Sequence, residues 1–242
     1  MIPKIIHYCW FGGNPLPEDA KKCIESWKKY CPDYEIVEWN EDSFDLNSNV
    51  YVKEAYDSKK YAFVTDYVRL FALCNHGGIY MDTDVEVVRN LDEFLDNHAF
   101  SGFESSNSIP TGIMGSEPNF ELFNDLKSYY DDRHFVNPDG TLDTTTNTVT
   151  ITNMCQKYGL VLNNEYQVIN GFALYPSDYF CPFENETGIL RKTENTATIH
   201  WFAKSWVNDE SSKMLKYTRI LHRLFGTERI HNLAVKLGLR KQ

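Results

Sequence analysis

The sequence lacks several features that would assign it to particular protein classes. None of its six cysteines forms a CxxC pair, so the spacing does not predict a zinc finger or a dithiol redox site. No apolar run approaches the ~20 residues that a membrane-spanning helix needs. The first residues lack a basic segment followed by an apolar one, the pattern of a secretory signal. We therefore expect a cytoplasmic protein whose cysteines are unpaired and buried.

Basic residues are scarce over most of the chain. Lys and Arg number 24 against 34 Asp and Glu, a net charge of −10, which argues against nucleic acid as a partner. Residues 213–242 are the exception, with eight basic residues and one acidic residue. Apolar residues recur there at helical spacing, so we expect basic amphipathic helices. Such helices either contact an anionic membrane surface peripherally or pack on an acidic protein body, and the sequence leaves both open.

The composition is that of a globular protein. The chain has 242 residues, of which 42% are hydrophobic and 14% aromatic, enough to form one substantial domain with a buried core. We expect this domain to span residues 1–212, followed by the basic helices of 213–242. Aromatic residues suit a protein that stacks on ring-shaped ligands, although ordinary core packing explains most of them equally well.

The most informative stretch runs from residue 61 to residue 88. Its first half has apolar residues at steps of three and four, which predicts a helix, and Gly77-Gly78 is a typical helix end. Residues 79–81 and 85–88 then read as strands, with Asp82-Thr83-Asp84 between them. This order places two carboxylates at the carboxyl end of a strand, where open α/β sheets bind ligands.

The two carboxylates need a positive partner. Asp82 and Asp84 stand at i and i+2, so on an extended chain they point the same way and repel each other. A divalent cation such as Mn²⁺ or Mg²⁺ suits oxygen ligands and also neutralises a bound diphosphate. The alternative is that Asp82 and Asp84 are turn residues exposed to solvent and bind no cation. The metal site is favoured by the preceding strand and by Asp66 and Arg69, one helical turn apart on one face.

The first forty residues predict the opening of a nucleotide-binding α/β unit. Residues 4–10 read as a buried strand, a helix follows Pro17, and residues 34–39 form a second strand. Trp10 ends the first strand beside two glycines. It either stacks on a nucleobase or belongs to the core, and spacing alone does not decide between them.

Later segments contribute further candidates. Residues 198–201 read as a last strand that delivers His200, and an imidazole joining two carboxylates favours Mn²⁺ over Mg²⁺. A core histidine is the simpler alternative. Glu104 and Asn107 lie in a poorly patterned region, where they either border an acceptor pocket or are solvated loop residues.

Three segments together resemble a known family. The stretch TDYVRLFALCNHGGIYMDTDVEV resembles the DXD-containing sugar transferases of glycosyltransferase family 32 and, more distantly, the large clostridial glucosylating toxins. The opening IPKIIHYCWFGG and the later HWFAKSW at 200–206 match the family's first strand and its C-terminal motif. This resemblance implies an α/β fold of GT-A type, a Rossmann-like domain with a mixed, mostly parallel sheet.

The resemblance also implies roles for individual residues. Asp84, Asp82 and His200 would hold Mn²⁺ or Mg²⁺, while Asp66 and Arg69 would bind the hydroxyls of the donor sugar. The remaining candidates would contact the donor nucleotide: Trp10 its base, Tyr80 its binding pocket, and Ser205 and Trp206 the metal and the β-phosphate.

The implied function is a metal-dependent retaining glycosyltransferase. It would move a hexose from a nucleotide sugar, with UDP favoured and GDP-mannose the alternative, to a glycan or lipid-linked oligosaccharide in bacterial capsule synthesis. The competing interpretation is a non-catalytic nucleotide-sugar-binding module or a toxin-like, protein-glycosylating one. A sugar nucleotidyltransferase is disfavoured because no glycine-rich, basic phosphate loop follows the first strand.

Overall fold

The computed structural model describes residues 1–203 except 111, together with residues 218–220, 222, 226 and 230. Its helices are α1 (Glu18–Tyr30), α2 (Val50–Asp57), α3 (Tyr61–His76), the 3-10 helix η1 (Asp92–Phe94), α4 (Glu121–Ser128), α5 (Asn147–Lys157) and α6 (Ser177–Phe180). Its strands are β1 (Ile5–Cys9), β2 (Glu35–Trp39), β3 (Gly78–Met81), β4 (Val85–Val87), β5 (Ala99–Gly102), β6 (Ile113–Ser116), β7 (Gln167–Ile169), β8 (Phe172–Tyr175), β9 (Phe183–Glu184), β10 (Ile189–Leu190) and β11 (Thr198–His200).

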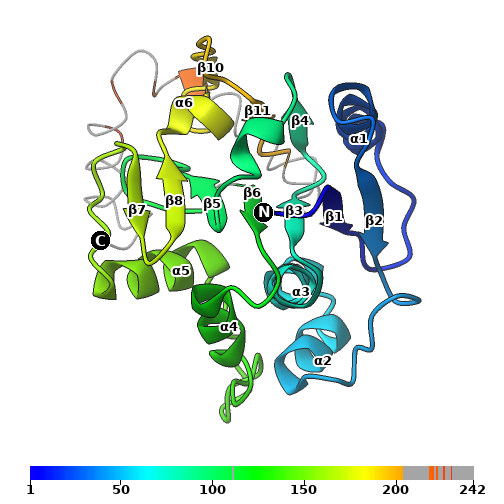
Figure 1. Cartoon of the computed structure of the whole chain (residues 1–242). Coiled ribbons are helices and arrows are strands. Elements are labelled where there is room, and N and C mark those ends of the chain that lie inside the picture. Colours follow the sequence, from blue (N-terminus) through cyan, green and yellow to red (C-terminus); the bar gives the residue numbers. More distant parts are fainter. Residues whose placement is uncertain (111, 204–217, 221, 223–225, 227–229, 231–242) are drawn as a thin grey trace.

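Seven of these strands form one twisted sheet in the order β2-β1-β3-β6-β5-β8-β7 (Figure 1). β2, β1 and β3 are parallel, β6 is antiparallel to both β3 and β5, and β8 is parallel to β5. β7 is antiparallel to β8, so five of the seven strands run the same way. The predicted α/β class with a mixed, mostly parallel sheet is confirmed.

The core lies on both faces of this sheet. On one face, α2 to α5 pack on alternate strand residues such as Tyr80 and Met114. On the other face, α1 and α6 cover Ile79 and Met81. Because neighbouring residues of β3 point to opposite faces, Asp82 continues on the side of Tyr80, the side on which α3 packs. The strand alternation therefore aims the first acidic side chain at α3.

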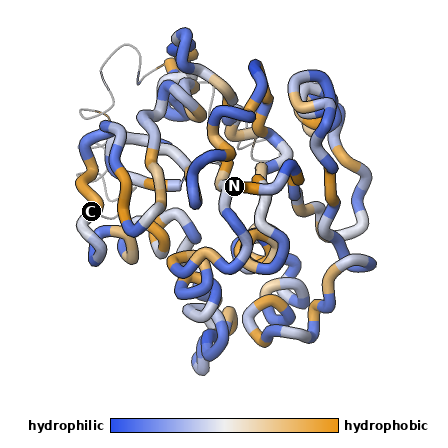
Figure 2. Tube along the Cα trace, viewed as in Figure 1, coloured by the Kyte–Doolittle hydropathy of each residue, from blue (hydrophilic) through white to orange (hydrophobic). Residues whose placement is uncertain are grey.

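Helix α3 and strand β3 meet at two glycines, as the sequence predicts. Gly77 caps α3 with φ 65°, and Gly78 begins β3 with φ 95°. A Cβ on Gly78 would lie 2.7 Å from the backbone oxygen of Ile5, so a side chain there would separate β3 from β1. The glycine pair thus allows a sharp reversal that sets the acidic triplet directly after a central strand. Figure 2 shows hydrophobic colouring along α3, which is seen end-on beside the sheet.

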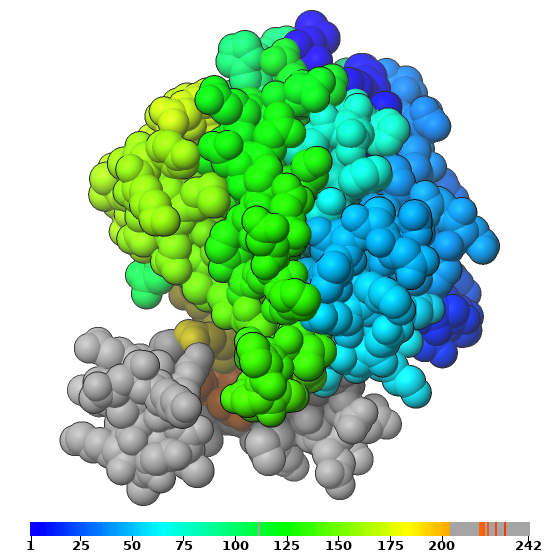
Figure 3. Space-filling view, turned by 90° about the horizontal axis from the view of Figure 1, so that it is seen from below, coloured from blue at the N-terminus to red at the C-terminus, as the bar shows by residue number. Residues whose placement is uncertain are grey.

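Helix α2 was not predicted from the sequence. It lies beside the segment that follows α4, as both Figure 1 and the view from below in Figure 3 show. The Glu54 carboxylate accepts the backbone N–H groups of Phe135 at 2.8 Å and Val136 at 3.0 Å. The local sequence carries no signal for this long-range pairing.

Two further expectations concern the cysteines and the tail. All six cysteines are buried and unpaired: Cys9, Cys23, Cys31, Cys74, Cys155 and Cys181. Within the described part of the chain, no helix is long and apolar enough to span a membrane. The helices expected over 213–242 fall almost entirely outside the described residues, so the predicted division into 1–212 and 213–242 stays a prediction.

Candidate active site

The candidate site lies at the carboxyl ends of the parallel strands. β3 ends at Met81, and Asp82 and Asp84 follow it directly. A chain reversal there is closed by the bond from the Val85 N–H to the Asp82 carbonyl at 3.0 Å. Asp82 and Asp84 are partly exposed, with 29% and 17% of their side-chain surfaces accessible. Both carboxylates are therefore held by the fold and remain reachable by a ligand.

His200 joins the two aspartates through strand pairing. β11 runs antiparallel to β4 and places His200 opposite Val85, the residue after Asp84. His200 Nε2 lies 3.4 Å from Asp84 Oδ1, and the ligand atoms of Asp82, Asp84 and His200 all lie within 4.8 Å of one another. The structure thus brings together the three residues that the sequence proposed as metal ligands.

Asp84 and the buried His200 form an ion pair. Burial opposes ionisation of Asp84, but His200 and the Ala203 N–H, 2.8 Å from Oδ2, outweigh it and lower the pKa of Asp84. Burial likewise disfavours a charged imidazole, yet the Asp84 carboxylate raises the pKa of His200 well above its ordinary value. The ring of Phe202 stacks on His200 at a centroid distance of 3.9 Å. Asp82, Asp84 and His200 could hold a cation, which would take the place of the imidazole proton.

Arg69 supplies the positive charge that the acidic pair requires. Its Nη2 lies 3.1 Å from Asp82 Oδ1 and 3.7 Å from Asp66 Oδ1. Its guanidinium stacks over the Tyr80 ring at 4.5 Å, and the Tyr80 hydroxyl donates to Asp82 Oδ1 at 3.0 Å. Asp66 and Arg69, which were predicted to share one helix face, therefore lie beside the acidic triplet. Tyr80 contacts both Arg69 and Asp82.

Asp66 is a buried carboxyl group. Burial raises the pKa of Asp66 to about 7, although Arg69 opposes this rise and the Asn147 N–H at the start of α5 also favours the carboxylate. The Asp82 charge acts in the same direction as burial, because a nearby negative charge opposes ionisation of Asp66. A carboxyl group whose pKa is near neutral pH can exchange its proton with a bound hydroxyl group.

Trp10 lies at the carboxyl end of β1 and is partly buried against the core on the face of the sheet that α1 and α6 cover. Its indole N–H donates to the Asn14 carbonyl, which fixes the ring at the rim of the sheet edge. The predicted contact with a nucleobase stays a prediction. Ser205 and Trp206 lie outside the described residues.

Two residues of the connection between β5 and β6 approach the site without a clear signal in the sequence. Gly112 accepts the Asp82 N–H at 2.8 Å, and a Cβ there would lie 3.1 Å from Asp82 Oδ2 and 3.2 Å from His200 Cε1. Burial raises the pKa of Glu104, the charge of His200 opposes this rise, and the charge of Asp82 adds to it. Asn107 is exposed. This connection reaches the site because β6 lies between β3 and β5 in the sheet, an order that the local sequence does not show.

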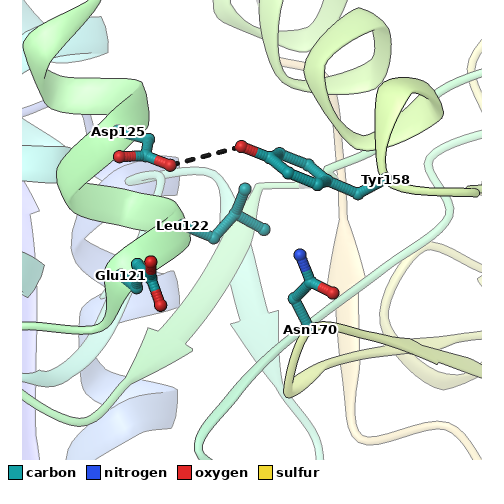
Figure 4. A pocket seen from close by; sticks show the side chains of 5 residues that line it. All are labelled: Glu121, Leu122, Asp125, Tyr158 and Asn170. Carbon is teal, nitrogen blue, oxygen red and sulfur yellow. Dashed lines mark hydrogen bonds between the residues drawn. The ribbon is translucent and has the colours of Figure 1, made fainter.

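A separate small pocket lies at the opposite end of the sheet (Figure 4). Glu121, Leu122 and Asp125 of α4 line it with Tyr158 and Asn170, and Tyr158 donates to Asp125 at 3.3 Å. Asn170 lies in the two-residue turn between β7 and β8, so this pocket is at the amino ends of the parallel strands. It takes no part in the acidic cluster.

The donor set of the acidic cluster fits a divalent cation. Two carboxylates and one imidazole are available on one side of the sheet edge. Oxygen ligands suit Mg²⁺ and Mn²⁺, and an imidazole nitrogen in the set favours Mn²⁺ of the two. Arg69 contacts the Asp82 carboxylate, and the Phe202 ring stacks on His200. Neighbouring residues of this kind orient metal ligands.

Comparison with known proteins bears on the same region. Residues 17–101 match the family described as "Glycosyltransferase sugar-binding region containing DXD motif". The predicted resemblance to DXD glycosyltransferases is confirmed. The matched segment contains Asp66, Arg69, Tyr80 and both aspartates of the acidic triplet, while His200 and the β5–β6 connection lie beyond it.

Curated relatives carry related names. An inositol phosphoceramide mannosyltransferase of Schizosaccharomyces pombe is 38% identical over 122 residues, 47% of this chain and 33% of that protein. An uncharacterised glycosyltransferase of Acanthamoeba polyphaga mimivirus is 33% identical over 133 residues, 51% of this chain and 53% of that protein. The chain thus spans between a third and about half of these relatives' lengths. Among solved structures, galactosyltransferase LgtC is 14% identical with a TM-score of 0.46, covering 90% of this chain and 94% of that one.

Proposed function

We propose that this chain is a metal-dependent glycosyltransferase of GT-A type that transfers a hexose from a nucleotide sugar. The observation that carries the proposal is the cluster of Asp82, Asp84 and His200 at the carboxyl edge of the sheet, with Arg69 directly behind it. The match of residues 17–101 to a DXD sugar-binding region supports it. Mn²⁺ is the favoured cation and Mg²⁺ the alternative.

The residues divide the work of the proposed reaction. Asp82, Asp84 and His200 would hold the cation, which when bound supplies positive charge beside the diphosphate leaving group. Arg69 and Tyr80 orient Asp82 through its Oδ1. Asp66, next to Arg69, presents a carboxyl group to the hydroxyls of the donor sugar. Trp10 would stack on the base, and Ser205 and Trp206 would approach the metal and the β-phosphate. We propose retention of configuration on the family resemblance.

The donor and acceptor are narrower proposals. UDP-linked hexose remains our prediction for the donor, with GDP-mannose as the alternative, which the mannosyltransferase name of the Schizosaccharomyces pombe relative supports. We propose a glycan or lipid-linked oligosaccharide as acceptor, in surface polysaccharide synthesis, on the cytoplasmic side. Peripheral membrane contact through residues 213–242 would bring the site to a lipid-linked acceptor.

A donor screen tests the proposed function. The full chain is incubated with Mn²⁺ and, in separate reactions, UDP-glucose, UDP-galactose, UDP-N-acetylhexosamines or GDP-mannose, and release of nucleoside diphosphate is measured. We expect slow hydrolysis of one donor, which EDTA abolishes and Asp84→Asn reduces by at least about 100-fold. Asp125→Asn, at the other end of the sheet, is the matched control and should retain full activity.

The same screen separates the alternatives. Binding of a nucleotide sugar with no turnover of any donor, even with acceptor sugars added, would favour the non-catalytic binding module. Neither binding nor turnover by the folded protein would overturn the proposal.

A further inference from the structure

The loop of residues 11–14, which we call the β1 loop, begins beside the acidic cluster. β1 and β3 are adjacent parallel strands, and His7 of β1 stands opposite Tyr80 of β3. β1 ends two residues further along, at Cys9, and is there level with Asp82. The β1 loop therefore leaves the sheet at the edge that carries the predicted metal ligands.

A carboxylate from another part of the chain binds this loop. Glu41 Oε1 accepts the Gly12 N–H at 2.6 Å and the Tyr56 hydroxyl at 2.9 Å. Glu41 lies two residues after β2, and Tyr56 belongs to α2. One carboxylate oxygen thus joins three segments that are distant in the sequence. Hydrogen bonds to an ionised acceptor are roughly twice as strong as neutral ones, so this contact holds the loop at Gly12.

An aromatic ring packs on the same glycine. Gly12 has a φ of 97°, a conformation that favours glycine. A Cβ there would lie 2.8 Å from Tyr61 Cζ, which shows that the Tyr61 ring lies directly against the Gly12 backbone. Tyr61 is the first residue of α3, and its ring centroid lies 5.4 Å from that of Tyr56. Gly12 is therefore fixed by both a hydrogen bond and a packed ring.

The orientation of the Trp10 ring depends on the path of the β1 loop. The Trp10 backbone N–H donates to the Trp39 carbonyl at 2.9 Å, which fixes the start of the loop. The indole N–H donates to the Asn14 carbonyl, across the loop. Gly12 and Gly13 lie between these two points, and glycine has the greatest backbone freedom of any residue. A bond that restrains Gly12 therefore also restrains the acceptor of the indole N–H.

We propose that Glu41 is a positioning residue for nucleotide binding. It holds the β1 loop at Gly12, so that the Trp10 ring is already oriented when the nucleobase arrives. This inference rests on the proposed glycosyltransferase function, in which Trp10 stacks on the base. A ring that is ordered before binding loses less conformational freedom on binding. The contact from Glu41 therefore raises the affinity for the nucleotide and leaves the metal ligands unchanged.

Nucleotide titrations of the full chain test the proposal. Binding of UDP and of GDP is measured by calorimetry with saturating Mn²⁺. We expect Glu41→Ala to weaken binding of the preferred nucleotide by at least about 10-fold, because the loop loses its restraint. Glu41→Gln keeps a side-chain oxygen that can accept the Gly12 N–H, so it should recover most of the affinity. Asp42→Ala removes the same charge from the adjacent, exposed position and should stay within about twofold of wild type.

Two further readouts distinguish positioning from a general loss of stability. Mn²⁺ affinity without nucleotide should stay within about twofold of wild type in Glu41→Ala. On the donor that the screen identifies, KM should rise while kcat stays within about threefold, as expected when binding is lost equally in the ground state and the transition state. Amide hydrogen exchange of residues 11–14 should become faster in Glu41→Ala without any ligand, and should keep the wild-type rate in Asp42→Ala.

A double-mutant cycle tests whether Glu41 acts through Trp10. Trp10→Leu keeps an apolar side chain and removes the aromatic face, so it should weaken nucleotide binding by at least about 10-fold. In this background Glu41→Ala should cost less than about twofold more, because two residues that act through one contact are not additive.

The outcomes separate this inference from the proposed function. Nucleotide affinity of Glu41→Ala equal to that of wild type would overturn the role of Glu41 and leave the glycosyltransferase intact. Equal losses on Glu41→Ala with and without Trp10 would also overturn it, because Glu41 would then act independently of the ring. A wild-type protein that binds neither nucleotide with Mn²⁺ present would instead remove the proposed function, and the role of Glu41 with it.

Discussion

Asp82 and Asp84 show how two adjacent like charges can share one site. Each carboxylate has its own cationic neighbour, Arg69 for Asp82 and His200 for Asp84. One neighbour comes from the helix before the pair, and the other from a strand more than a hundred residues later. Both carboxylates therefore have a positively charged neighbour, and a bound cation would compete with the proton of His200.

His7 is a buried residue whose protonation state the structure specifies. Trp39 donates its indole N–H to His7 Nδ1 at 3.2 Å, so Nδ1 is unprotonated, and Nε2 donates to the Gly77 carbonyl at 2.9 Å. Burial lowers the pKa of His7 to about 4 from 6.5. Protonation of Nδ1 would break the bond from Trp39 and place a charge beneath the glycine turn.

This predicts acid destabilisation of the fold. Between pH 6.5 and pH 4 the unfolded chain binds a proton at this histidine and the folded chain does not, so stability rises with pH. The contribution is fully present above pH 6.5 and is lost as pH falls toward 4, by up to about 1.4 kcal/mol per pH unit.

Urea unfolding at several pH values checks this prediction. His7→Gln, which cannot titrate, should show a shallower fall in the free energy of unfolding over this range than wild type. His98→Gln, at an exposed position, should keep the wild-type slope. Equal slopes in wild type and His7→Gln would contradict the prediction.

The residues of the site differ in how far the sequence could predict them. Asp66, Arg69 and the acidic triplet lie within one helix–turn–strand segment, where the helical period and the glycine pair place them near one another. Gly112 could not be assigned from its neighbours. Its proximity depends on the order β3-β6-β5, in which the chain passes through β5 before returning to β6, and local sequence does not encode that order.

At the scale of elements, the acidic cluster depends on a close approach of β6, β4 and β11. Gly112 stands at the contact: its missing Cβ would lie 2.8 Å from Val85 Cγ2 and little more than 3 Å from Asp82 and His200. Val85 is buried opposite His200 in the β4–β11 pair. A methyl group at Gly112 must therefore displace the Val85 side chain and crowds Asp82 and His200.

Gly112→Ala should weaken Mn²⁺ binding by about 10- to 100-fold, because it crowds the ligands and leaves their identity unchanged. Equilibrium dialysis or Mn²⁺ electron paramagnetic resonance measures this. Gly140→Ala is the control, since its Cβ meets nothing within 4 Å and only its φ of 82° adds strain. That variant should lose some stability and keep its metal affinity. Wild-type affinity in Gly112→Ala would show that the cluster does not bind the ion.

The elements themselves were predicted with uneven success. β1, α1, β2, α3, β3 and β11 were located within a residue or two, because their periodicity and end signals agree. α2 and the β9–β10 hairpin were not identified. α2 is short, and its position depends on contacts between Glu54 and the residues after α4, which no local pattern shows.

At the scale of the whole molecule, the ligand-bearing segments converge because the parallel strands end at one edge. Trp10 follows β1, and Asp82 and Asp84 follow β3. The pocket of Glu121 and Asp125 lies at the other edge. The residues that we expect to bind ligands therefore lie, within the described part of the chain, at the carboxyl ends of the parallel strands. This common location favours a single reaction centre at that edge.

The central claim is that Asp82, Asp84 and His200 form a divalent cation site that a nucleoside diphosphate completes. A Mn²⁺ titration followed by electron paramagnetic resonance tests it most directly, with and without UDP or GDP. We predict one saturable site per chain that tightens with one of the two nucleotides and weakens by more than about 100-fold in Asp84→Asn. Binding that does not saturate, or equal affinity in wild type and Asp84→Asn, would contradict the account.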